Sequence, residues 1–251
     1  MTRDSDRARP DPWGQPMPMR RPVKACFGRI PAAVGLLVLG ALVGGVEIWA
    51  AERVQVLGFA PGKNGVPDGW ELFVNVGEAD LALVQDGEDR ALELRSRASS
   101  FSLQRKVAID LTRTPFVVWQ WKVTELPKRG DFRHRATDDQ AAQLYVVFSW
   151  EVFRKEAIAY IWDSTAPEGT TAQIPSPVLY PFLNLHVVVV RSGAGERGKW
   201  ITETRNVAED YRKLFGAAPD KVQGVMVQIN SQHTESRAEA HWRFVRFTPY
   251  P

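Results

Sequence analysis

Cysteine is almost absent from this sequence of 251 residues, in which Cys26 is the single example. Cys26 precedes a hydrophobic run, whereas the cysteine of a lipoprotein would follow one. The chain after that run has no thiol, which excludes disulfide bonds, cysteine nucleophiles and cysteine-ligated metals there. A domain in this part of the chain must therefore be stabilised by its hydrophobic core.

An excess of charge is also missing from most of the chain. The net charge is +3, and the first 29 residues contain seven basic and three acidic side chains. From Glu52 onward there are 25 basic and 25 acidic residues. Because a nucleic-acid-binding domain needs a basic surface, this balance predicts no nucleic-acid partner.

The short motifs of common catalytic sites are absent too. The sequence contains no Gly-x-Ser-x-Gly elbow, no P-loop and no dinucleotide-binding fingerprint. Its four histidines have neither His-x-His nor His-Glu-x-x-His spacing, so their pattern does not predict a zinc site. A carboxylate pair for glycoside chemistry needs only proximity in space, and no spacing in the sequence indicates one.

One long hydrophobic run is present, the uncharged segment from Ala32 to Val46. Arginine and lysine side chains precede it, so the positive-inside rule places the N-terminus in the cytoplasm. The run is long for a signal-peptide core and short for a spanning helix. We therefore predict that residues 30–51 form a hydrophobic helix, either a cleaved signal peptide or a retained membrane anchor.

Three regions follow from the position of this segment. Residues 1–29 are rich in Pro, Arg and Asp and lack periodicity, which is typical of a disordered tail, here a basic cytoplasmic one. Residues 30–51 are the signal peptide or anchor. Residues 52–251 are predicted to be one exported domain, periplasmic or otherwise extracytoplasmic, which is anchored in the inner membrane or released after cleavage.

Short apolar runs separated by turn residues dominate the predicted domain. They predict strands over residues 91–96, 101–105, 115–123, 142–150, 157–162, 185–191, 199–205, 222–230 and 239–247. Asn206 and Glu209 have capping-box spacing, and Gly216 ends the apolar pattern of one short helix. Residues 166–181 are predicted to be a long loop. This order predicts a mainly β fold, an antiparallel β-sandwich of the jelly-roll type with one short helix.

Clustered aspartates precede one of the predicted strands. Asp138 and Asp139 follow Asp131 and His134 closely in the sequence. Carboxylate and carbonyl oxygens are the ligands of Ca²⁺, so Asp131, Asp138 and Asp139 form a candidate calcium site. Two alternatives stay open: the aspartates accept hydrogen bonds from the backbone of a turn, or they serve acid–base catalysis with His134.

Tryptophan can provide a flat surface on which a sugar ring stacks. Trp119, Trp121 and Trp242 alternate with other apolar residues, a pattern that is typical of a buried core. Trp150 and Trp162 lie at strand ends, where loops gather. These two are therefore the better candidates for a binding surface.

Polar residues occupy the opposite phase of several late strands. If those strands are neighbours, their side chains form one continuous surface whose amide and guanidinium groups can bind a glycan. The alternative is the solvated side of an antiparallel sheet. The residues are Gln120, Lys122, Glu203, Arg205, Gln228, Asn230, Glu239, His241 and Arg243.

Several motifs occur together in a recognisable order. They are Val118-Trp-Gln-Trp-Lys-Val123, the strand entry from Thr137 to Phe148, Ile158-Ala-Tyr-Ile-Trp162 and the block from Arg205 to Gly216. Over residues 67–247 the chain resembles the bacterial domain-of-unknown-function family numbered 3047. The resemblance implies an exported β-sandwich with no assigned reaction. The acidic Asp-x-Asp-Asn-Thr run of that family is replaced by Asn230-Ser-Gln-His-Thr234, which argues against a cation or acid role at this turn.

These features lead to one hypothesis and two alternatives. The leading hypothesis is a non-catalytic envelope module that binds a glycan or another polar ligand. One alternative is a glycan-active hydrolase or lyase that uses the loop aspartates, and the other is a structural or assembly protein of the envelope. The candidate ligand-binding residues are Lys122, Asp138, Asp139, Trp150, Trp162, Arg205, Asn230, His241 and Arg243.

Overall fold

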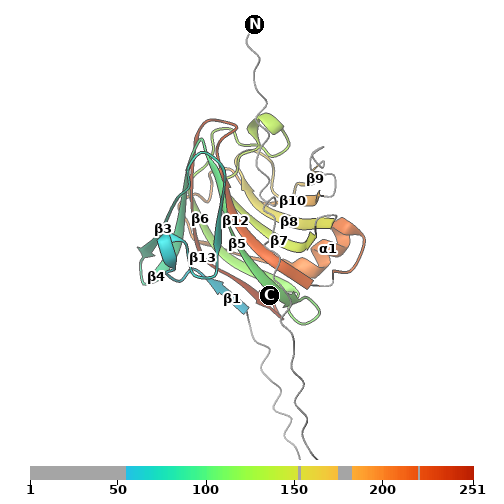
Figure 1. Ribbon diagram of the computed structural model, residues 1–251. Helices are drawn as coiled ribbons and strands as arrows, with labels where there is room; N and C mark the ends of the chain where they lie inside the picture. The colour runs from blue at the N-terminus through green and yellow to red at the C-terminus, as the bar shows by residue number, and fades with distance from the viewer. Residues whose placement is uncertain (1–54, 152–153, 175–182, 220) are drawn as a thin grey trace, which may run out of the picture.

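Two β-sheets packed face to face form the fold of the computed structural model, which describes residues 55–151, 154–174, 183–219 and 221–251 (Figure 1). The predicted tail and the predicted hydrophobic segment 30–51 lie outside these residues. Within the described ranges, no helix has both the length and the apolar character needed to cross a membrane.

The six-stranded sheet has the order β11-β6-β13-β4-β3, and β1 pairs with the C-terminal half of β13. All of these pairs are antiparallel. The last strand of the chain, β13, therefore occupies the centre of the sheet. The strands are β1 (Gln55–Gly58), β3 (Asp80–Asp86), β4 (Asp89–Arg97), β6 (Phe116–Glu125), β11 (Ile201–Asn206) and β13 (Arg237–Thr248).

The seven-stranded sheet has the order β2-β5-β12-β7-β8-β10-β9. Its strands are β2 (Glu71–Val76), β5 (Ser100–Asp110), β7 (Ala142–Glu151), β8 (Arg154–Asp163), β9 (Thr171–Ile174), β10 (Leu183–Ser192) and β12 (Lys221–Asn230). Two short 3-10 helices, η1 (Lys63–Gly65) and η2 (Arg135–Thr137), lie in connections between strands.

The predicted mainly β sandwich is confirmed, and each predicted strand is present. Strands β1, β2, β3 and β9 were not predicted. One pair differs from the antiparallel expectation, because β10 runs parallel to β8. The predicted long loop contains β9, which pairs antiparallel with β10 at the sheet edge. The chain thus passes to the edge and returns alongside β8 in the same direction.

The predicted helix is confirmed as α1 (Val207–Phe215). The Asn206 side chain accepts a hydrogen bond from the backbone nitrogen of Glu209, which satisfies one of the free N–H groups at the helix start. Gly216 ends the helix with φ +72°, a left-handed conformation that favours glycine. Aromatic side chains of α1 pack against the seven-stranded sheet.

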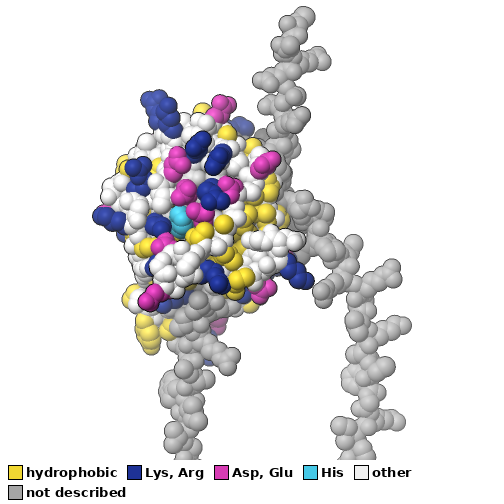
Figure 2. Space-filling model, turned by 90° about the vertical axis from the view of Figure 1, so that its left-hand side faces the viewer, with side chains coloured by type: hydrophobic (Ala, Val, Ile, Leu, Met, Phe, Trp, Pro, Cys, Tyr) yellow, Lys and Arg dark blue, Asp and Glu magenta, His cyan; other side chains and the backbone are white. Residues whose placement is uncertain are grey.

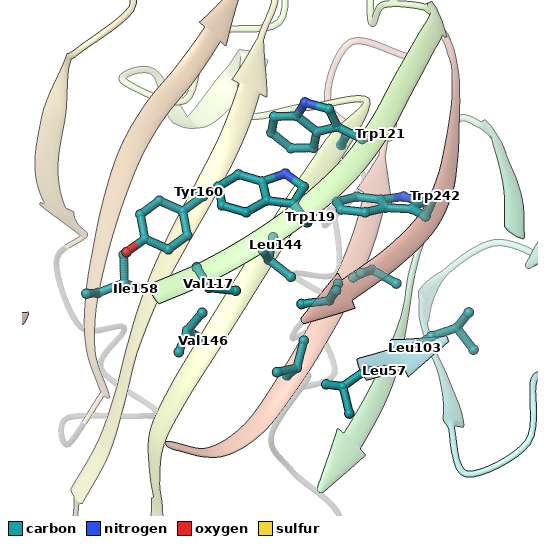
Figure 3. Close-up of a cluster of buried hydrophobic side chains, with 14 of the residues drawn as sticks. Leu57, Leu103, Val117, Trp119, Trp121, Leu144, Val146, Ile158, Tyr160 and Trp242 are labelled. Carbon is teal, nitrogen blue, oxygen red and sulfur yellow. The ribbon is translucent and has the colours of Figure 1, made fainter. Parts of the chain in front are cut away.

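Tryptophan side chains dominate the core between the sheets (Figure 3). Trp119, Trp121 and Trp242 are fully buried, as their alternation predicted. The ring of Trp121 lies 5.4 Å from that of Trp119 and 5.4 Å from that of Trp242, both in edge-on geometry. Edge-on aromatic pairs contribute to stability beyond the area that they bury.

Trp162 belongs to the same core, so its prediction as a binding surface is wrong. It is fully buried, and its ring lies 5.9 Å from that of Trp121. The indole Nε1 donates to the carbonyl of Gly193 at 3.0 Å. Trp162 shares the inward phase of β8 with Ile158 and Tyr160, which places it between the sheets despite its position near the strand end.

A buried carboxylate joins the two sheets beside this core. Glu203 of β11 is 7% exposed and accepts hydrogen bonds from Trp121 Nε1 at 3.3 Å and from Arg191 Nε at 2.6 Å. Arg191 belongs to β10 of the other sheet. Because a buried carboxylate is costly unless it is paired, these two donors make Glu203 compatible with the interior.

We expect Trp121→Ala to lower the free energy of unfolding by about 3–5 kcal/mol, because it removes the central ring of the tryptophan cluster and leaves a cavity. Urea denaturation followed by tryptophan fluorescence measures this loss. Val74→Ala is the control, since Val74 is 45% exposed and its truncation is expected to change stability by about 0.5 kcal/mol or less. Equal losses for the two variants would contradict the prediction.

Candidate functional site

The predicted site residues do not form one surface, because their strands belong to different sheets. Lys122, His241 and Arg243 lie on the outer face of the six-stranded sheet. Asn230 and Trp150 belong to strands of the seven-stranded sheet. The continuous polar surface expected from the sequence is therefore not formed, since strand order rather than sequence phase decides which polar residues meet.

Arg205, another candidate ligand-binding residue, is engaged inside the fold. Its guanidinium donates two hydrogen bonds to the carboxylate of Asp210 in α1, at 2.6 and 2.9 Å. The same guanidinium lies 5.7 Å from the centre of the Tyr160 ring. Arg205 therefore holds α1 against the sandwich and does not share a face with Lys122.

Asp138 and Asp139 stabilise a turn. The Asp139 carboxylate is fully buried and accepts hydrogen bonds from the Thr234 backbone nitrogen at 2.6 Å, the Thr234 hydroxyl at 2.7 Å and the His233 backbone nitrogen at 3.2 Å. Burial acts to raise the pKa of Asp139, but the hydrogen bonds from His233 and Thr234 outweigh it and lower this pKa. Asn230 donates from Nδ2 to the carbonyl of Asp138 at 2.8 Å, which fastens the segment to β12.

Asp131 forms a separate set of contacts. Its carboxylate accepts two hydrogen bonds from the Arg133 guanidinium, at 2.7 and 2.8 Å, and one from the Thr165 hydroxyl at 3.0 Å. In the part of the chain that the structure describes, Asp131, Asp138 and Asp139 do not bring their carboxylate oxygens within reach of one ion. The predicted calcium site is therefore not formed, because each carboxylate is used by its own loop.

The outer face of the six-stranded sheet carries charged side chains that contact one another (Figure 2). Lys122 forms an ion pair with Asp86, and Arg243 forms one with Asp89 at 3.3 Å. The Lys122 ammonium and the Arg243 guanidinium lie 4.8 and 4.2 Å from the ring centre of Trp200. We name this group the charged face. Its cations are paired with acids and with one indole ring.

His241 lies on the same face beside two glutamates. Its Nε2 is 3.3 Å from Oε1 of Glu93, and Glu239 completes a group whose ligand atoms all lie within 4.8 Å of one another. Burial lowers the pKa of His241 and Lys122 adds to the effect, although the carboxylates of Glu93 and Glu239 oppose it. Burial and the nearby ammonium of Lys122 therefore favour the neutral form of the imidazole.

A second group of polar side chains lies on the outer face of the seven-stranded sheet. Ser102 of β5 and Gln143 of β7 are both cross-strand partners of Gln228 in β12. Gln104 and Tyr145 lie in the next row on this face, on either side of Met226. We name six residues the amide patch, each at most 8% exposed: Ser102, Gln104, Gln143, Tyr145, Gln228 and Asn230.

Hydrogen bonds fix one half of the amide patch and leave two atoms of the other half without partners. The Tyr145 hydroxyl donates to Oε1 of Gln143 at 2.8 Å, and Nε2 of Gln143 donates to Oδ1 of Asn230 at 2.7 Å. Among the described residues, Oε1 of Gln228 and Oγ of Ser102 have no hydrogen-bond partner. Since buried polar atoms are nearly always satisfied, this adjacent acceptor and hydroxyl are suited to a bound hydroxyl group or a water molecule.

Apolar side chains share this face with the amide patch. Met226, Val147 and Tyr145 belong to one hydrophobic cluster, and the half-buried Trp150 packs against it. A Cβ atom on Gly224 would lie 2.5 Å from the Trp150 ring, so this glycine leaves space for the indole. The structure therefore places Trp150, a candidate from the sequence, on the same outer face as the amide patch.

Several residues of both faces were not predicted from the sequence. Ser102 and Gln104 alternate with Phe101 and Leu103, and this alternation was the available signal. It separates two sides of a strand, but the packing of the sheets decides which neighbours those polar side chains meet. Trp200 fell within the predicted strand 199–205, but the observed strand β11 begins at Ile201, so Trp200 lies just before it.

In the sequence, all residues of the amide patch and of the charged face fall within the range from Asp86 to Arg243. The family described as "Protein of unknown function (DUF3047)" matches residues 68–246, a range that contains both groups. The chain belongs to DUF3047. No curated protein matches this DUF3047 chain.

Solved structures similar to this DUF3047 chain include three carbohydrate-related proteins. The family 11 carbohydrate-binding module of a cellulosomal cellulase of Clostridium thermocellum has a TM-score of 0.43 and 8% identity, over 78% of this chain and 94% of that one. The xyloglucanase domain of a type three effector from Sinorhizobium fredii, in complex with cellobiose, has a TM-score of 0.44 and 8% identity, over 72% of this chain and 95% of that one. The Emp47p carbohydrate recognition domain has a TM-score of 0.43 and 14% identity, over 79% of this chain and 97% of that one. At TM-scores below 0.5, these similarities establish neither a shared ligand nor a shared reaction.

We expect Asp139→Asn to lower the free energy of unfolding at pH 7 by about 1–3 kcal/mol, because it removes a charged acceptor of three hydrogen bonds. A carboxylate with a lowered folded-state pKa stabilises the protein above its unfolded pKa, near 3.8, and loses this effect as the pH falls through the folded value. The difference from the unsubstituted protein should therefore shrink below about pH 4.

Urea denaturation between pH 7 and pH 3 measures this difference. Asp138→Asn is the matched control, since the Asp138 side chain accepts a hydrogen bond from Gln140 at 3.2 Å and lies outside the buried turn contact. A difference that is constant over the whole pH range would show that the ionised state of Asp139 is not what stabilises the turn.

Proposed function

We propose that this DUF3047 domain is a non-catalytic binding module for a polyhydroxylated ligand of the carbohydrate class, held at the amide patch. The observation that carries the proposal is the adjacent pair of buried atoms without partners, Oε1 of Gln228 and Oγ of Ser102. A sugar hydroxyl both donates and accepts a hydrogen bond. One hydroxyl group can therefore satisfy both atoms.

The chemistry around this pair supports a neutral polar ligand. The patch reaches the surface at Gln104, Tyr145 and Gln228, each 8% exposed. None of its side chains is charged at neutral pH, so binding there does not require a charge in the patch to be desolvated. The half-buried Trp150 supplies apolar surface on the same face. Such a combination of apolar side chains and a few placed polar groups is typical of small-ligand sites.

The enzymatic alternative receives no support from the loop aspartates. Asp139 accepts hydrogen bonds from Thr234 and His233, and Asp131 accepts them from Arg133. These carboxylates are thereby committed to the loops. Envelope location and export by residues 30–51 stay predictions from the sequence, and binding at the amide patch does not depend on them.

The test is thermal denaturation of the full chain with a panel of soluble oligosaccharides, including cello-, xylo- and manno-oligosaccharides and peptidoglycan fragments. A ligand that binds only the folded state raises the unfolding midpoint. We expect one class of glycan to raise it. We expect Gln228→Leu to weaken binding of that glycan about tenfold or more, because it removes a hydrogen-bonding group worth about 1.4 kcal/mol.

Gln120→Leu is the matched control. Gln120 is also a glutamine on an outer sheet face, but it is half-buried and lies on the six-stranded sheet. The Gln120→Leu substitution should leave glycan binding unchanged. A panel in which no glycan raises the midpoint would refute the proposal. Equal binding by the Gln228 variant and the unsubstituted protein would place the ligand elsewhere.

A further inference from the structure

An imidazole and two carboxylates converge on the six-stranded sheet, away from the amide patch. Glu93 of β4 and His241 of β13 are direct cross-strand partners. Glu239 lies two residues before His241, on the same side of β13. The side chains of such neighbours lie close enough to act together, and the ligand atoms of all three are within 4.8 Å of one another.

Neighbouring side chains hold the two carboxylates in place. Arg95 donates from its guanidinium to Oε2 of Glu93 at 2.6 Å, while Oε1 of Glu93 lies 3.3 Å from Nε2 of His241. The hydroxyl of Thr124 donates to Oε1 of Glu239 at 2.5 Å. Hydrogen bonds of this kind orient the ligands of metal sites and tune their affinity.

His241 is the least exposed member of the group. It is 7% exposed, its Nε2 is directed at Glu93, and within the described residues its Nδ1 has no hydrogen-bond partner. The cations nearby are shared with other acids. Arg95 also binds Asp80, and Lys122 is paired with Asp86. Glu93 therefore shares Arg95 with Asp80, and its other oxygen faces the imidazole of His241.

We propose that Glu93, Glu239 and His241 bind a divalent transition-metal ion of the zinc type. One nitrogen and two carboxylate oxygens are a common ligand set for such ions, and three protein ligands leave a position for water. Calcium prefers an all-oxygen site, so the imidazole selects against it. Because the ligands come from two paired strands, the metal contacts both β4 and β13, and Glu93 is far from Glu239 and His241 in the sequence.

The experiment is isothermal titration of the metal-free full chain with Zn²⁺, accompanied by absorption spectra with Co²⁺ as a probe of nitrogen and oxygen ligation. We expect one ion per chain at this site and little response to Ca²⁺. His241→Gln and Glu93→Gln should each weaken Zn²⁺ binding at least tenfold, because outer-shell changes alone commonly weaken binding by about 10–100-fold. The Co²⁺ spectrum should change in both variants.

His134→Gln is the matched control, because His134 is an exposed histidine outside the group and its loss should leave the titration unchanged. Unfolding midpoints measured without metal show whether each variant is folded. If His241→Gln does not fold, Glu239→Gln decides, since it keeps the shape of the side chain and removes its charge. Absence of stoichiometric Zn²⁺ binding, or unchanged affinity in the folded variants, would overturn the proposal.

Discussion

The packing of Trp121 between the sheets is the contact on which much of the domain depends. Its ring contacts Trp119 and Trp242 within the six-stranded sheet and Trp162 of the other sheet. Its indole nitrogen donates to Glu203, which is also bound by a guanidinium of the opposite sheet. In a chain whose described part has no cysteine, these aromatic and polar contacts take the place that disulfide cross-links occupy in many other small domains.

The same packing decides what each outer face contains. With Trp121 turned inward, Lys122 must point outward, because side chains alternate along a strand. In the same way, the inward position of Leu144 turns Gln143 outward. One sandwich therefore presents a charged face on one sheet and an uncharged amide patch on the other. The two ligands that we propose therefore differ in chemistry: a metal cation on the six-stranded sheet, and a hydroxyl-bearing molecule on the seven-stranded sheet.

Local patterns predicted the elements of this fold well. As expected, α1 begins after the capping residue Asn206 and ends at Gly216. The alternation of Trp119, Trp121 and Val123 identified β6 and its buried side. Strand β3 was missed because most of its residues, on both sides, are only half-buried. Such a strand lacks the contrast between an apolar and a polar side that sequence analysis detects.

The candidate sites were less predictable, because they depend on strand order. Gln228 and Lys122 looked alike in the sequence, but their strands lie in different sheets. Glu93 and His241 are far apart along the chain and meet only through the pairing of β4 with β13. The interpretation of Asp139 as a turn residue was already one of the alternatives, and the contact with Thr234 that supports it is again distant in sequence.

The central position of β13 has a consequence for how the protein is made. This strand pairs with β1, β4 and β6, yet its residues are synthesised after those of all three partners. Until residues 237–248 have been synthesised, β4 and β6 have unpaired edges that can associate with other chains. The six-stranded half of the sandwich can therefore close only after β13 has been synthesised, and a chain that stops before residue 237 lacks the middle of its sheet.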